Sequence, residues 1–143
     1  MLANVKELID ASNNLNIEIF LLNEKDAQKY IESVLAIYKP FKTDGHLGIG
    51  GNTVSIPTEK YEFSYSQYLK EEPAYVFFGQ DSNIAKKSVV KVNNAEMLGE
   101  LFENAYGMEY FVSNEIMDYL IAVNWYTIES AGIAIQYLLP LKI

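Results

Sequence analysis

The single histidine of the chain, His46, is the first residue whose chemistry could support catalysis. It lies in the segment DGHLGIGGN near Asp44, and a Ser–His–Asp or Cys–His mechanism or a His-containing metal site would have to use it. No G-x-S-x-G or H-E-x-x-H motif accompanies it, and its four neighbouring glycines lack both a G-K-[ST] ending and a following amphipathic helix. We therefore expect a mobile loop or a turn. A small-molecule-binding or enzymatic domain that uses this His46 glycine-rich loop is kept as an alternative function.

Carboxylates are abundant, and pairs of them perform general acid–base and glycoside chemistry. Three of them share one side of an expected helix over 94–106, a spacing that also suits an ordinary solvated face: Glu96, Glu100 and Glu103. Asp118 and Glu129 lie among apolar and aromatic residues of expected strands, where an exposed acid is common. None of these sets is specific for an enzyme, so we expect no catalytic activity, no metal and no cofactor.

Aromatic residues are candidates for binding, because Tyr and Trp bury much area while ordering few torsions. Tyr65, Tyr68 and Trp125 fit a binding surface or the core equally well, and Tyr126 follows Trp125 at the end of an expected strand. The core is the expected place of a second set: Tyr75, Phe77 and Tyr110. Exposed aromatics beside acids would suit a basic protein partner.

The helix over 94–106 is the clearest element that could position these residues. Its apolar residues recur at i, i+3, i+4, i+7 and i+8 and form one stripe: Leu98, Leu101, Phe102, Ala105 and Tyr106. Asn94 can cap its start, and Gly107 can end it in a left-handed turn. A helix polarised in this way needs a sheet to pack on, and the apolar runs EYFV and YLIAVNWY beside it are expected strands.

Further helices and strands are expected on either side. The helices cover 2–12, ended by Asn13 and Asn14, and the segment from a capping Asn23 to Pro40. The strands cover 16–23, 53–56, a hairpin within 74–92 and a last strand over 133–143. Residues 61–69 suggest a further strand or an aromatic surface segment. Short connections favour antiparallel pairing. We predict a single α+β domain over 1–143, a mainly antiparallel sheet of about five to six strands with two to three helices on one face.

Composition excludes several classes of protein. Without cysteine there is no thiol catalysis, disulfide, zinc–thiolate site or Fe–S cluster. All basic residues are Lys and the net charge is −8, which argues against nucleic-acid binding, because such proteins place Arg and Lys along one face. No apolar run is long enough to span a membrane and the N-terminus lacks a signal-peptide pattern, so no membrane association and a cytoplasmic location are expected.

A family resemblance narrows the function. YVFFGQDS, a helix ending in LFENAYG, and MEYFVSNEIMDYLIAVNWYTIESAG resemble, over residues 74–132, small acidic bacterial proteins of the SUKH-like kind. Many of these are immunity proteins of polymorphic toxin and contact-dependent growth-inhibition systems. The resemblance implies a scaffold that binds a cognate secreted toxin, such as a nuclease, and occludes its active site without catalysis.

The resemblance carries no contact residues, so the predicted ones come from the acids and aromatics of this chain. They are Glu96, Glu100, Glu103, Asp118, Trp125, Tyr126, Glu129, Tyr65 and Tyr68. The expected partner is a basic protein toxin, and the chain itself is expected to be a monomer or a weak homodimer. A third possibility is a structural subunit that self-associates through an exposed strand edge over 133–139.

Overall fold

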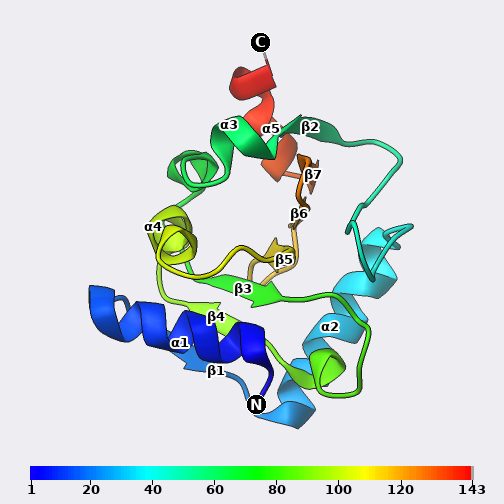
Figure 1. Cartoon of the computed structure of the whole chain (residues 1–143). Helices are drawn as coiled ribbons and strands as arrows, with labels where there is room; N and C mark the ends of the chain where they lie inside the picture. The colour runs from blue at the N-terminus through cyan, green and yellow to red at the C-terminus, as the bar shows by residue number, and fades with distance from the viewer. Residues whose placement is uncertain (143) are drawn as a thin grey trace.

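Two neighbouring strands are buried at every position, β5 (Tyr110–Ser113) and β6 (Tyr119–Val123). Side chains alternate between the faces of a strand, so such strands must be covered on both sides. The computed structural model describes residues 1–142 and has helices on both faces of one seven-stranded antiparallel sheet (Figure 1). The predicted α+β class with an antiparallel sheet is confirmed, with seven strands in place of five or six.

The strands are ordered β1-β4-β3-β5-β6-β7-β2. The remaining strands are β1 (Ile19–Leu21), β2 (Val54–Pro57), β3 (Ala74–Phe77), β4 (Val90–Val92) and β7 (Thr127–Gly132). The α-helices are α1 (Ala3–Leu15), α2 (Glu24–Tyr38), α3 (Thr58–Tyr61), α4 (Leu98–Glu103) and α5 (Ala134–Leu138). Short 3-10 turns are η1 (Tyr65–Tyr68), η2 (Ala85–Lys87), η3 (Ala95–Met97) and η4 (Leu139–Lys142).

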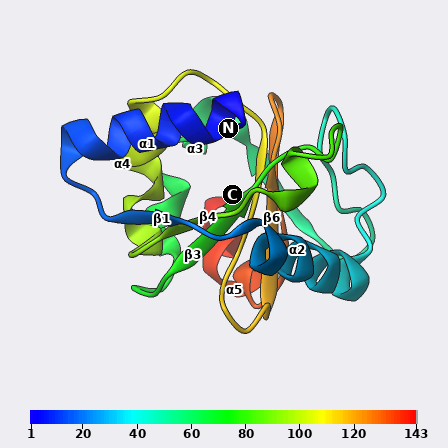
Figure 2. The same cartoon turned by 90° about the horizontal axis from the view of Figure 1, so that it is seen from below.

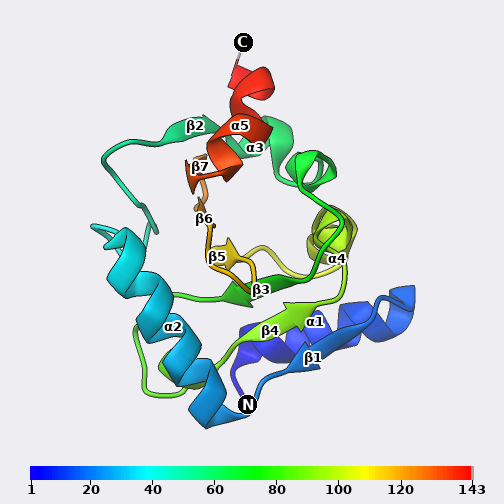
Figure 3. The ribbon, with the colours of Figure 1, turned by 180° about the vertical axis from the view of Figure 1, so that it is seen from behind.

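The helices divide between the two faces of the sheet, so the prediction of helices on one face is wrong. Helix α2 packs alone on one face through Ala27, Tyr30, Ile31 and Val34. Helices α1, α4 and α5 cover the other face, and Figure 3 shows α2 and α4 on opposite sides of the strands. Figure 2 shows α1 and α2 separated in the same way by β1 and β4. The reason is the double burial of the central strands, which one helical layer could not satisfy.

Helix α4 is shorter than the predicted helix over 94–106. Asn94 caps its 3-10 start as expected, its Oδ1 accepting the Glu96 N–H at 3.0 Å. The helix ends at Glu103, where the Asn104 N–H bonds to the Leu101 carbonyl. Gly107 therefore does not end it, and Tyr106 is 79% exposed instead of joining the apolar stripe. The chain leaves the helix early because it must reach β5, where the Phe102 ring stacks on Tyr110 with centroids 3.8 Å apart.

Four other segments differ from their predicted structure. The run YLIAVNWYTI is two strands, β6 and β7, joined by a turn at Asn124. Residues 61–69 are mostly helical turns, and α1 runs through Asn13 and Asn14 to Leu15. Helix α5 and the start of η4 stand where the last strand was predicted, so that strand is wrong and 133–139 offer no strand edge. Over 61–69 and 133–139, local alternation could not distinguish a short strand from a short amphipathic helix, and tertiary packing decided between them.

A buried pair of tyrosines links η1 to β5. The Tyr65 and Tyr110 hydroxyls are 2.8 Å apart, and both side chains are almost fully buried. Burial raises the pKa of both, so both hydroxyls stay protonated at neutral pH and one donates to the other.

We expect Tyr65→Phe to lower the free energy of unfolding by about 1–3 kcal/mol, because it leaves the Tyr110 hydroxyl buried without a partner. The double variant Tyr65→Phe/Tyr110→Phe should be destabilised by less than the sum of the two single variants, since no orphaned hydroxyl remains. Urea denaturation of the four proteins measures this coupling. Strict additivity would show that the hydroxyls do not interact.

Candidate functional site

The glycine-rich loop between α2 and β2 is anchored to the sheet by side chains. The Leu47 N–H donates to Glu109 Oε1 at 3.0 Å, and the Leu47 carbonyl accepts from Asn124 Nδ2 at 2.9 Å. Glu129 Oε1 accepts the backbone N–H of Gly50 at 2.8 Å and that of Ile49. Leu47 and Ile49 are buried in the α2-side core. The segment is a loop, as expected from sequence, and the central residues of this loop are packed and hydrogen-bonded.

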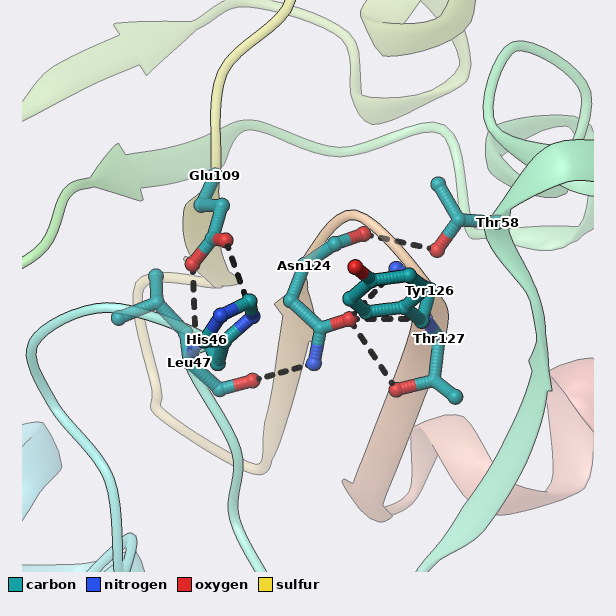
Figure 4. Close-up of polar contacts among 7 residues, drawn as sticks. All are labelled: His46, Leu47, Thr58, Glu109, Asn124, Tyr126 and Thr127. Atoms are coloured by element: carbon teal, nitrogen blue, oxygen red, sulfur yellow. Dashed lines mark hydrogen bonds and ion pairs between the residues drawn. The ribbon is translucent and has the colours of Figure 1, made fainter.

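Asn124 connects three segments of the chain at the end of β6 (Figure 4). Its Oδ1 accepts the N–H groups of Tyr126 and Thr127, both at 2.8 Å, and so shapes the β6–β7 turn. Its Nδ2 holds Leu47, and its carbonyl accepts from Thr58 Oγ1 at 2.8 Å. This amide side chain therefore helps to position the exposed pair Trp125 and Tyr126, together with the backbone bonds from the Asn124 N–H to the Thr127 carbonyl and from the Thr58 N–H to the Tyr126 carbonyl.

His46 lies over this turn with little around it that could react. Its side chain is 65% exposed, and its ring stacks on Tyr126 with centroids 5.8 Å apart. Its Nδ1 is 3.9 Å from Glu109 Oε2, the only ion pair within residues 1–142. In that same part of the chain, no three His, Cys, Asp or Glu side chains come together in a way that could hold a metal ion. The arrangement orients an imidazole against a carboxylate and a ring, with no hydroxyl nucleophile hydrogen-bonded to it.

A hollow of about 440 Å³ lies beside this turn, and we call it the Trp125 hollow. Five separate segments of the chain contribute to its wall. Its carboxylates are Asp44, Asp81 and Glu109, and no Lys lines it. Trp125 is 52% exposed and packs on Gly107, where an added Cβ would come within 3.0 Å of the indole. The hollow thus joins an aromatic face to acids.

A second hollow of about 490 Å³, the Tyr106 hollow, lies between α1 and the end of α4. Its acids are Glu7, Asp10 and Glu103, and again no Lys lines it. The Tyr106 N–H points to Glu7 Oε2 at 3.4 Å, which holds the segment after α4 against α1. The two hollows are neighbours, because α1 and this segment contribute residues to both.

The predicted contact residues divide between this region and the rest of the surface. Glu103, Trp125 and Tyr126 are exposed at the two hollows or next to them. Glu100 lines a different hollow with Glu18. Glu96 is half-buried at the start of the helix, where its carbonyl accepts from η1.

Four other predicted residues do not join Trp125. Tyr65 is fully buried, so its side chain is not available to a partner in this fold. Tyr68 is exposed on η1. Asp118 precedes β6 whereas Trp125 follows it, so they lie on the order of 20 Å apart. Glu129 is occupied with the loop backbone. The alternation of side chains along a strand could not show that these residues lie away from Trp125. Their places depend on where each strand begins.

Sequence reasoning did not include most acids of the hollows among the contact residues: Glu7, Asp10, Asp44, Asp81 and Glu109. Glu7 and Asp10 share one side of α1, but the two hollows combine acids from segments far apart in the chain, which no spacing could group. Asn124 did leave a signal, because Asn inside an apolar run favours a turn.

No protein-family model matches the chain, and neither a curated protein nor a solved structure matches it. The SUKH-like resemblance therefore stays a prediction. Across residues 1–142, no helix combines the length and the apolar character needed to cross a membrane.

We expect Asn124→Ala to lower the free energy of unfolding by about 2–4 kcal/mol, because each hydrogen bond lost from its side chain contributes on the order of 1 kcal/mol. Chemical denaturation measures the change, and Asn83→Ala at an exposed position is the control. Equal stability of the two variants would show that the turn does not depend on this amide.

Glu129→Ala should release the loop, because the N–H groups of Ile49 and Gly50 lose their shared acceptor. We expect faster amide exchange at 47–50 by about tenfold or more, whereas Glu129→Gln keeps an oxygen acceptor and should change it much less. Hydrogen-exchange mass spectrometry measures both. A glutamine variant as fast as the alanine variant would mean that the charge itself holds the loop.

Proposed function

We propose that this chain is an immunity protein that binds a basic toxin domain, such as a nuclease, and occludes its active site. The contact surface would comprise the Trp125 hollow, the Tyr106 hollow and the exposed Tyr126. The SUKH-like resemblance of residues 74–132 suggests this function, and the arrangement of charge and aromatic side chains supports it.

The observation that carries the proposal is the placement of large exposed aromatics among acids that no Lys neutralises. Tyr106, Trp125 and Tyr126 are 79%, 52% and 71% exposed. Aromatic side chains of this kind are enriched at the centres of protein interfaces. The acids of the two hollows have no Lys partner within residues 1–142, since the one ion pair there involves His46. A surface of this kind complements a basic cleft that normally holds nucleic acid.

The net charge of −8 adds a long-range effect to this local one. Opposite charges on two proteins raise their association rate. At 0.1 M salt this attraction is largely screened beyond roughly 10 Å. Burial of the aromatic groups would instead set how slowly the complex dissociates.

A second candidate function is the binding of a small molecule in the Trp125 hollow. The specific observation is that the hollow adjoins the His46 loop, through Asp44, Gly45 and Leu47, and has a volume within the usual range of ligand sites. This function would not need a protein partner.

The proposal is tested by titration calorimetry against the polypeptide encoded immediately upstream of this chain. We expect nanomolar one-to-one binding that weakens as salt rises. In stopped-flow measurements at low salt, Glu103→Lys should slow association by about threefold to tenfold, because it reverses a charge in the Tyr106 hollow. Glu32→Lys is the matched control, an equal charge change at an exposed site of α2 on the other face of the sheet.

Equal rates for the two variants would mean that the Tyr106 hollow is not part of the contact surface. No heat at micromolar concentrations would contradict binding of that polypeptide and would favour the small-molecule alternative.

A further inference from the structure

We infer that the Trp125 hollow receives one arginine side chain of the protein partner, with its guanidinium group against the indole and Glu109. This inference rests on the proposed function and names the chemical group that the surface recognises. It is carried by the shape of the hollow, the sign of its charge and the incomplete bonding of one carboxylate.

The hollow is large enough for one long side chain and has an aromatic wall. About 440 Å³ is open between Trp125, Met108 and the loop residues Asp44 and Gly45. Trp125 packs on Gly107 and follows the residue that shapes the turn, so the fold places its ring at the hollow. Flat cations stack on the face of an indole, and arginine does so more often than lysine.

The charge of the wall selects a cation. Asp44, Asp81 and Glu109 contribute three carboxylates, and no Lys lines the hollow. A weaker positive charge opposes these carboxylates. It comes from the first turn of α1, where Leu2 and Asn4 reach the rim of the hollow. A helix N-terminus is equivalent to about half a positive charge, so the carboxylates determine the sign. His46 is exposed and 3.9 Å from Glu109, and it can move aside.

The bonding of Glu109 shows which of these carboxylates is open to a cation. Its side chain is only 14% exposed, and one of its oxygens accepts the Leu47 N–H. The other oxygen, Oε2, has no protein hydrogen bond within residues 1–142 and lies 3.9 Å from His46 Nδ1. It is not among the buried atoms without a partner, so it is accessible from the hollow. A guanidinium in the hollow would supply the missing donors in a planar arrangement that carboxylates favour.

The experiment uses fluorescence, because Trp125 is the only tryptophan of the chain and reports directly on the hollow. The full-length protein is titrated with N-acetyl-arginine amide, and with N-acetyl-citrulline amide as a neutral probe of nearly the same shape. We expect a saturable change in Trp125 emission with the arginine probe, in the millimolar range of a single side chain, and none with the citrulline probe.

Two variants and a control locate the site. Glu109→Gln, which keeps an acceptor for Leu47, should weaken the arginine probe about tenfold, the loss expected for a charge-assisted hydrogen bond. Asp81→Asn should weaken it by a smaller factor, since its carboxylate is exposed. Glu100→Gln removes an acid from a different hollow and should leave the affinity unchanged.

The inference is overturned if the citrulline probe binds as well as the arginine probe, if neither binds, or if Glu109→Gln has no effect. Nanomolar partner binding with no response to the arginine probe would remove this inference and leave the proposed function intact. If the arginine probe binds in the hollow but the upstream polypeptide does not bind at all, the hollow does not serve an arginine side chain of that partner. This outcome would overturn the inference and the proposed function together.

Discussion

Burial of β6 on both faces is the constraint on which the rest of the structure depends. Every residue of this strand is buried, so both faces of the sheet must be covered and both ends of the strand must turn sharply into exposed segments. An asparagine stands at each end. Asn114 hydrogen-bonds Asp118 and Glu72 before the strand, and Asn124 organises the turn after it. The exposed aromatics are consequently held at one end of a rigid strand.

Carboxylates have two physical roles in this protein. Glu109 and Glu129 accept backbone N–H groups of the loop between α2 and β2, and they keep that irregular segment packed against the sheet. Acids of the other kind, such as Asp10 and Glu103, are exposed and have no Lys nearby in the hollow that they line. Some of the acids of the molecule therefore hold internal backbone groups, and others are exposed on its surface. The surface acids are spread over the molecule, and Glu7, Asp10 and Glu103 lie together between α1 and the end of α4.

Several elements could be predicted from sequence because their signals are local. Asn23 caps α2 by accepting the Asp26 N–H at 2.8 Å, and Tyr30, Ile31 and Val34 are its buried face. The AYVF strand and its return strand pair as an antiparallel hairpin, as the alternating and turn residues indicate. The failures are also physical. The residues after Glu103 have helical spacing but must leave the helix to reach β5, and long-range packing decides that.

The candidate site was less predictable than the fold. Trp125, Tyr126 and Glu103 could be named because large aromatics and free acids are recognisable by type, whereas Glu109 could not, since its importance depends on a loop 62 positions away in the chain. The sequence by itself determined the α+β class, the antiparallel pairing, the acidic charge and the absence of thiol chemistry, because these follow from composition and local periodicity. Only the tertiary structure decided which acids are used internally and which surround Trp125, because that depends on contacts between distant segments.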